Sequence, residues 1–176
     1  ADPSIRQHIK QVVFIDFDRN SIEASKELAK KNGFIDKCKP ISESLVKVFL
    51  GKETLLQYLE RNGIILNASD SIFVECVGLA DYLKPRRRMN LYDSIASLGD
   101  GKREFHGVFA HVRAEQEGAD YKQQEFMENA LNWAKNGPMY GLDKPQFQSD
   151  LSSYKEKGYN ITIITDPHMG YFVGYF

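Results

Sequence analysis

Two patterns of apolar residues alternate along the chain. Short unbroken runs of Val, Ile and Phe predict strands buried on both faces of a parallel sheet. Stretches with an apolar residue every three or four positions predict helices. The predicted strands are residues 11–16, 37–41, 71–77, 104–112, 160–165 and 170–176. The predicted helices are residues 21–32, 54–61, 87–98, 121–134 and 146–157.

The first predicted helix carries signals at both ends. Asn20 is a suitable N-cap, and Glu23 three positions later completes a capping box. Gly33 suits the left-handed position at which many helices end. With the strand before it, this helix makes a strand–helix unit.

The alternation of strands and helices predicts an α/β fold. We expect a three-layer sandwich with a mainly parallel sheet and right-handed crossovers. The last two predicted strands are joined only by residues 166–169, so we expect them to form a C-terminal antiparallel hairpin. The length of 176 residues favours a single domain over residues 1–176.

Composition narrows the functional classes. The 23 Lys and Arg residues almost balance the 24 Asp and Glu residues. A nucleic-acid-binding protein needs excess positive charge to displace counterions, so nucleic acid is not the expected partner. Cys38 and Cys76 do not make a disulfide framework, which favours a cytoplasmic location. No apolar stretch is long enough for a membrane-spanning helix.

In folds of this class, ligands bind beyond the carboxyl ends of the strands. Asp16 comes directly after the first strand, where a carboxylate can accept hydrogen bonds from a ribose diol. Phe17 is placed to form a wall for an adenine ring, and Asp18 is a second acid. Residues 42–44 follow the next strand. The alternative is that Asp16 only ends its strand and Asp18 only caps the turn.

A third position of this kind follows residues 71–77. Gly78 would let a ligand approach the backbone closely, and Asp81 and Tyr82 would line the cleft. The alternative is a helix start capped by Asp81. Glu75 interrupts an apolar run, so it is either a cleft acid or a sign that the strand is less enclosed. Tyr140 follows a Gly-Pro break and is a candidate substrate wall.

Other chemistry has little support in the sequence. The four histidines lack metal-ligand spacing, so we expect no metal, and no nucleophile motif is present. The run Arg86–Arg88 is typical of a solvated helix face, with a phosphate or acidic substrate as the alternative.

Taken together, these segments resemble a class I S-adenosylmethionine-dependent methyltransferase, which has a Rossmann-like fold. Residues 12–18 and the helix after them resemble the family's second strand and helix, and residues 70–83 resemble its fourth strand and following loop. The resemblance implies that Asp16 binds the ribose of S-adenosylmethionine and that Ser42 and Glu43 reach its adenine. It also implies methyl transfer, for which near-zero net charge favours a small-molecule acceptor.

One feature of the family is not found. Its glycine-rich loop follows a first strand that should precede residue 12, but residues 1–11 contain no glycine. We therefore expect an incomplete methyltransferase fold. The chain would be the C-terminal portion of a longer protein, or a missing N-terminal segment or a partner chain would complete the sheet.

Two other functions compete with this interpretation. Asp16 and Asp18 match the nucleophile and acid of a haloacid-dehalogenase-like phosphatase, which uses Mg²⁺, although Asn20 departs from that pattern. A non-catalytic methyltransferase-like binding scaffold would explain the missing loop. For a methyltransferase the catalytic residues are unknown, and a general base is needed only if the acceptor must lose a proton. The candidates for that base are Glu75, Asp81, His111 and Tyr140.

Overall fold

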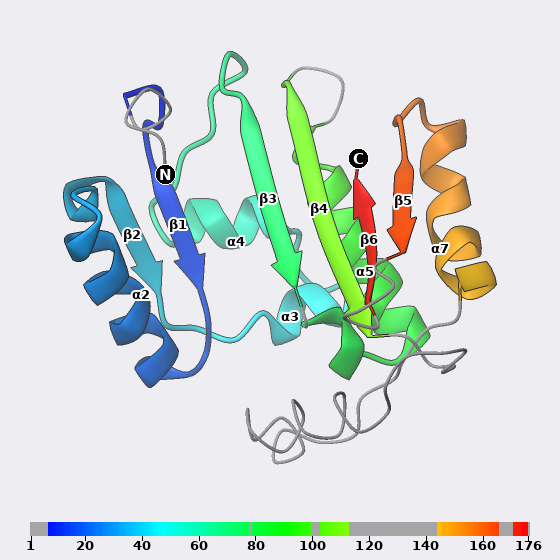
Figure 1. Ribbon diagram of the computed structural model, residues 1–176, viewed down its shortest axis with the longest axis horizontal. Helices are drawn as coiled ribbons and strands as arrows, with labels where there is room; N and C mark the ends of the chain where they lie inside the picture. Colours follow the sequence, from blue (N-terminus) through cyan, green and yellow to red (C-terminus); the bar gives the residue numbers. More distant parts are fainter. Residues whose placement is uncertain (1–6, 78, 100–102, 113–143, 166–170, 176) are drawn as a thin grey trace. The chain divides into compact units, whose positions relative to one another are not determined.

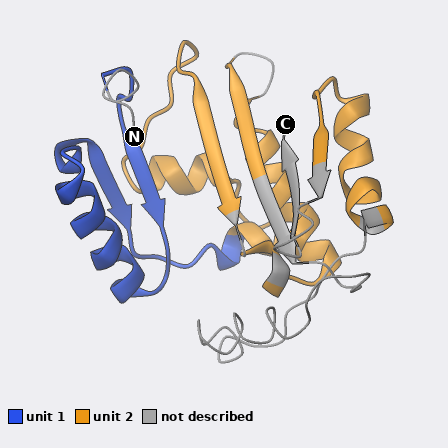
Figure 2. Cartoon of the chain, viewed as in Figure 1, with its two compact units in different colours: residues 1–47 blue, residues 48–176 orange. Residues whose placement is uncertain are grey.

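The computed structural model describes residues 7–77, 79–99, 103–112, 144–165 and 171–175 (Figure 1). The chain divides into two compact units, residues 1–47 and residues 48–176 (Figure 2). The fold is mixed α/β, as expected, with parallel strand pairing in both units. Whether the whole chain is one domain stays a prediction. Within the described ranges, no helix has both the length and the hydrophobicity to cross a bilayer.

Unit 1 is a strand–helix–strand unit. Strand β1 (Val12–Ile15) leads into helix α2 (Arg19–Lys31), and the chain returns through the 3₁₀ turn η1 (Ile35–Lys37) to strand β2 (Cys38–Ile41). The two strands are parallel, with Val12 opposite Cys38 and Ile15 opposite Ile41. The buried apolar side chains among the described residues of this unit are Ile22, Ala29 and Ile41.

The ends of α2 test the predicted caps. Gly33 has a φ of 72°, so the predicted left-handed end is confirmed. The predicted N-cap was wrong: the cap is Asp18, whose carboxylate accepts a hydrogen bond from the backbone N–H of Asn20 at 2.9 Å. Asp and Asn are about equally good caps, and because Asp18 stands two residues earlier, Asn20 is taken into the helix.

Strand β1 is half-buried along its whole length, not enclosed on both faces as its apolar run suggested. Among the described residues, β1 is paired with β2 alone, so one edge of β1 has no strand beside it there. The side chain of Leu28 in α2 is exposed.

Unit 2 contains a four-stranded sheet in the order β3-β4-β6-β5. Strand β3 (Ile72–Val77) is parallel to β4 (Phe105–Val112). Strand β6 (Tyr171–Tyr175) is antiparallel both to β4 and to β5 (Thr162–Thr165). The sheet is therefore parallel on one side and antiparallel on the other.

The helices of unit 2 lie close to their predicted ranges. They are α4 (Leu55–Arg61), α5 (Pro85–Ala96) and α7 (Lys144–Glu156). Two short elements were not predicted: helix α3 (Val46–Phe49), which crosses the boundary between the units, and the 3₁₀ turn η2 (Ala80–Tyr82). Helix α5 begins two residues earlier than predicted because Pro85, with its fixed φ, suits the first helical position. The predicted helix 121–134 lies outside the described residues.

The core of unit 2 lies against one face of its sheet. In Figure 1, α5 passes behind β4 and β6. Phe105 of β4 packs edge-on against the ring of Tyr159 at 6.2 Å between centroids. The opposite face carries Phe73, Glu75 and His106, all exposed. The largest fully buried side chains among the described residues are Arg88, Tyr58, Tyr92, Tyr154, Phe147, Ile64, Leu91, Leu98, Leu151 and Val48.

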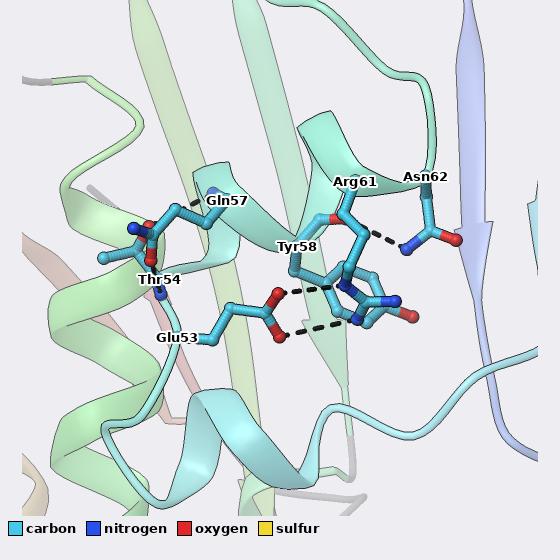
Figure 3. Close-up of polar contacts among 6 residues, drawn as sticks. All are labelled: Glu53, Thr54, Gln57, Tyr58, Arg61 and Asn62. Carbon is cyan, nitrogen blue, oxygen red and sulfur yellow. Dashed lines mark hydrogen bonds and ion pairs between the residues drawn. The ribbon is translucent and has the colours of Figure 1, made fainter.

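Helix α4 is fixed by polar contacts at both ends (Figure 3). Thr54 and Gln57 form a capping box, in which each side chain accepts a hydrogen bond from the other residue's backbone N–H. Near the other end, Arg61 forms an ion pair with Glu53 at 3.0 Å and lies over the ring of Tyr58.

Candidate functional site

The carboxyl edge of β1 and β2 gathers the predicted cofactor residues of unit 1. Asp16 directly follows β1, and its backbone N–H donates to the carbonyl of Ile41 at the end of β2, at 3.2 Å. Ser42 and Glu43 come next after Ile41. Because the strands are parallel and in register, all of these residues leave the sheet at the same edge.

The carboxylate of Asp16 keeps hydrogen-bonding capacity. It belongs to a half-buried residue, and its Oδ1 accepts a hydrogen bond from the backbone N–H of Asp18 at 2.9 Å. No further hydrogen bond to this carboxylate occurs among the residues that the structure describes. A carboxylate has about four lone-pair positions, so the second oxygen can accept donors from a ligand.

Phe17 and Asp18 next to it have different environments. The side chain of Phe17 is 68% exposed, which leaves a large apolar ring uncovered beside a polar edge. Asp18 accepts hydrogen bonds from the backbone N–H of Asn20 and from the hydroxyl of Ser21. Asp18 therefore has a structural task at the start of α2. Ser42 and Glu43 are both exposed.

The predicted site residues of unit 2 are only partly described. Gly78 and Tyr140 lie outside the described residues. Asp81 lies within η2, and the N-cap of α5 is Lys84, so the alternative in which Asp81 caps that helix was wrong. Tyr82 is half-buried in η2, which packs against β4.

Glu75 lies on an open face of the sheet. It is exposed on β3, on the same face as Phe73, whose side chain is 66% exposed. The interpretation that this strand is less enclosed than its sequence suggests is confirmed. Of the other candidate bases, the side chain of His111 lies outside the described part. Among the residues that the structure describes, no group of three His, Cys, Asp or Glu side chains is arranged to hold a metal ion.

The structure also divides the run of three arginines. Arg86 and Arg87 are exposed, but Arg88 is 1% exposed and forms an ion pair with Asp150 of α7 at 2.8 Å. The sequence contains a signal for this, since Arg88 shares a helical spacing with Leu91, Tyr92 and Ile95, which are also buried.

By sequence, the chain matches no protein-family model and no curated protein. Its fold, however, is similar to those of several solved structures. One is a possible exported protein from Bordetella parapertussis, with a TM-score of 0.59 and 12% identity over 94% of this chain and 52% of that chain.

Two other similar structures are a methyltransferase and a putative methyltransferase. The magnesium protoporphyrin IX methyltransferase ChlM from Synechocystis PCC 6803, with bound SAH, gives a TM-score of 0.53 at 8% identity, over 98% of this chain and 66% of that chain. A putative O-methyltransferase from Nostoc punctiforme PCC 73102 gives a TM-score of 0.56 at 13% identity, over 98% of this chain and 46% of that chain. The chain thus spans from about half to about two thirds of these structures. At such low identity the likeness concerns the fold alone: the chain has an α/β fold similar to that of S-adenosylmethionine-dependent methyltransferases.

Proposed function

We propose that the chain is part of an S-adenosylmethionine-dependent methyltransferase that acts on a small-molecule acceptor. The observation that carries the proposal is the carboxylate of Asp16, half-buried at the carboxyl edge of a parallel strand pair with one oxygen available to a ligand. The fold similarity supports it, because one similar structure holds SAH and another is a complex that includes SAM (DhpI, TM-score 0.51, 10% identity).

The residues of unit 1 fit the nucleoside part of the cofactor. Asp16 would accept hydrogen bonds from the ribose hydroxyls, and the exposed ring of Phe17 would cover one face of the adenine. Ser42 and Glu43 would contact the adenine edge. Asp18 would act mainly by holding the turn in which Asp16 lies, since its N–H donates to Asp16 and its carboxylate caps α2.

The remaining predicted residues would contact the rest of the cofactor and the acceptor. Gly78 would allow close approach of the cofactor to the backbone, and Asp81, Tyr82 and Tyr140 would contact the acceptor. When bound, S-adenosylmethionine supplies an electrophilic methyl group. The protein therefore has to orient the acceptor and exclude water, and these are tasks of positioning.

We also propose that one more parallel strand completes the sheet, provided by an N-terminal segment or by a partner chain, in a three-layer sandwich. Among the described residues, β1 pairs with one strand and β3 pairs with one strand. Parallel sheets usually have both faces covered, so the exposure of Phe73 on β3 supports the further layer of the sandwich, over that face, rather than the added strand itself. The cytoplasmic location stays a prediction.

Calorimetric titration with SAH tests the proposal. The chain should be titrated beside a version extended upstream, because the added strand is expected to bind the rest of the cofactor. In the form that binds SAH, Asp16→Ala should weaken binding by about 1–3 kcal/mol, since it leaves the ribose hydroxyls unpaired. Asp36→Ala is the control: it removes a carboxylate from the same unit, but an exposed one at the amino end of β2.

The alternatives give different results. Equal SAH affinity in Asp16→Ala and in the parent protein would overturn the ribose role. If no form binds SAH, Mg²⁺-dependent release of phosphate from p-nitrophenyl phosphate, abolished in Asp16→Ala, would establish the phosphatase. Failure of both assays would leave the non-catalytic scaffold.

A further inference from the structure

Two helices of the chain end in the same dipeptide. Asn32 and Gly33 follow α2, and Asn62 and Gly63 follow α4. Asn-Gly pairs are prone to spontaneous deamidation, because glycine has no side chain that hinders attack by its backbone nitrogen. A third such pair, at positions 136 and 137, lies outside the described residues. The two described pairs can therefore be compared as modification sites.

Deamidation converts an asparagine into an acid without an enzyme. At the first pair, the backbone nitrogen of Gly33 would lose its proton and form a bond to Cγ of Asn32, the Cγ–Nδ2 bond would break, and ammonia would leave. Water then opens the resulting succinimide ring, which gives aspartate if water attacks Cγ and isoaspartate if it attacks the backbone carbonyl. Overall one water is consumed and one ammonia is released. The reaction therefore needs a glycine N–H and an asparagine amide that can turn towards each other.

At the end of α2, both reacting groups are held by the last carbonyls of the helix. The Nδ2 of Asn32 donates to the carbonyl of Leu28 at 2.8 Å. The backbone N–H of Gly33 donates to the carbonyl of Lys30 at 3.1 Å. Both hydrogen bonds have to break before Gly33 can attack, so Asn32 can react only when the end of α2 opens.

The end of α4 has the same local geometry (Figure 3). The Nδ2 of Asn62 donates to the carbonyl of Tyr58 at 2.9 Å, and the backbone N–H of Gly63 donates to the carbonyl of Glu60 at 2.8 Å. Gly63 and Gly33 share a φ of 72°, and the two asparagines are both half-buried. Any difference in reactivity must therefore come from how readily each helix end opens.

The surroundings of the two helix ends differ. Ile64, directly after Gly63, is 2% exposed, whereas Phe34, directly after Gly33, is half-buried. An apolar contact just beyond the glycine commonly stabilises a helix end of this kind. Helix α4 also belongs to unit 2, while α2 packs against the two-stranded sheet of unit 1. A sheet of two strands is only marginally stable, so the end of α2 should open more often.

We propose that Asn32 is a site of spontaneous deamidation controlled by the opening of unit 1, and that Asn62 is protected by the larger core of unit 2. The product loosens unit 1 further. A carboxylate at position 32 cannot donate to the carbonyl of Leu28, and its negative charge lies at the end of α2 where the helix dipole is also negative. Because unit 1 carries Asp16, the modification also weakens the proposed cofactor site, but the proposal itself does not depend on a cofactor.

The test compares the two sites in the folded and the unfolded chain. The protein is incubated at mildly alkaline pH with and without guanidinium chloride and is then digested with pepsin in acid, where deamidation stops. Mass spectrometry gives the fraction of acid at each position. In guanidinium chloride the two sites should react at nearly equal rates, because both precede glycine. In the folded chain both should be slower, and Asn32 should react about tenfold or more faster than Asn62.

Matched variants test the consequence of the modification. Asn32→Asp carries the charge of the product and should speed hydrogen exchange of the β1 and β2 amides by about fivefold or more. Asn62→Asp makes the same change at the end of α4 and should leave those amides unchanged. Equal rates at the two sites in the folded chain, a faster reaction at Asn62, or a rate at Asn32 unaffected by folding would overturn the site. Unchanged exchange of β1 and β2 in Asn32→Asp would overturn the loosening of unit 1.

Discussion

Arg88 and Asp150 form a buried ion pair between α5 and α7. Their side chains are 1% and 8% exposed. Removing one partner of such a pair leaves the other charge in a poorly solvated site, which typically costs about 3–5 kcal/mol. We expect Arg88→Met to lower the free energy of unfolding by that amount, as measured by urea denaturation. The main cause would be the unpaired charge of Asp150, because Met keeps most of the side-chain volume.

Two further variants isolate the charge effect. Arg86→Met, two residues earlier in α5 and exposed, should change the free energy of unfolding by less than about 0.5 kcal/mol. The double variant Arg88→Met/Asp150→Leu should recover most of the loss, because apolar replacements of both partners are often neutral. If the double variant is as unstable as Arg88→Met alone, packing and not charge explains the loss.

Tyr154 gives the protein a dependence on alkaline pH. Its hydroxyl donates to Asp93 at 2.8 Å. Burial first, and then the hydrogen bond and charge of Asp93, raise the pKa of Tyr154 well above its usual value. A raised pKa in the folded state means that the unfolded chain loses this proton first, near pH 10. The stabilisation is therefore complete below about pH 10 and declines as the pH rises further.

We expect Tyr154→Phe to reduce this decline. Near pH 8, the free energy of unfolding of the variant should be about 1 kcal/mol lower than that of the parent protein, because the hydrogen bond to Asp93 is removed. Above about pH 10, its free energy of unfolding should fall less steeply than that of the parent protein, by up to about 1.4 kcal/mol per pH unit. Urea denaturation from about pH 8 to 11 measures both slopes, and equal slopes would show that Tyr154 does not cause the decline.

At the scale of single elements, α4 depends on its first residue. The hydroxyl of Thr54 accepts the backbone N–H of Gln57, and the Gln57 side chain accepts the backbone N–H of Thr54 (Figure 3). We expect Thr54→Ala to lower the free energy of unfolding by about 1 kcal/mol, since the backbone N–H of Gln57 at the helix end loses its acceptor. Ser69→Ala, at an exposed position outside any helix, should have almost no effect. Equal stability of the two variants would contradict a role for the cap.

The element ranges were largely predictable because local signals determine them. Apolar runs located the strands, and Gly33 located the end of α2. The start of α2 was not predicted, because Asp18 and Asn20 are both good caps and sequence does not decide between them. The burial of Arg88 was not predicted either, since a charged run normally suggests solvent and its partner Asp150 lies far along the chain.

The candidate site was predictable to the same degree. Asp16 and Ser42 could be located because each follows directly on a strand, and parallel strands end at one edge. The structural role of Asp18 needed the hydrogen bonds of the α2 turn. The position of Asp81 within η2 was missed because a 3₁₀ turn of three residues has no periodic signal to read.

At the scale of the whole molecule, the two units differ in how much core they contain. Unit 1 has a two-stranded sheet and one long helix, with Ile22, Ala29 and Ile41 as its buried apolar side chains among the described residues. Unit 2 has a four-stranded sheet and buries many large side chains, including Tyr58, Leu91 and Phe147. A two-stranded sheet is only marginally stable in water, whereas more strands and packed helices add cooperative stability.

We therefore expect unit 1 to open more easily than unit 2. In native-state hydrogen exchange, the amides of β1 and β2 should show a lower free energy of opening than those of β3 and β4, because opening a smaller core exposes less apolar surface. SAH at saturation should raise the protection of β1 selectively if Asp16 binds the ribose, since a ligand stabilises the state that it binds. The Asp16→Ala variant is the control. At the same SAH concentration it should gain less protection in β1, because it binds SAH more weakly. Equal opening free energies for β1 and β3 without ligand would show that the two units unfold as one, and would argue that the single-domain prediction is right.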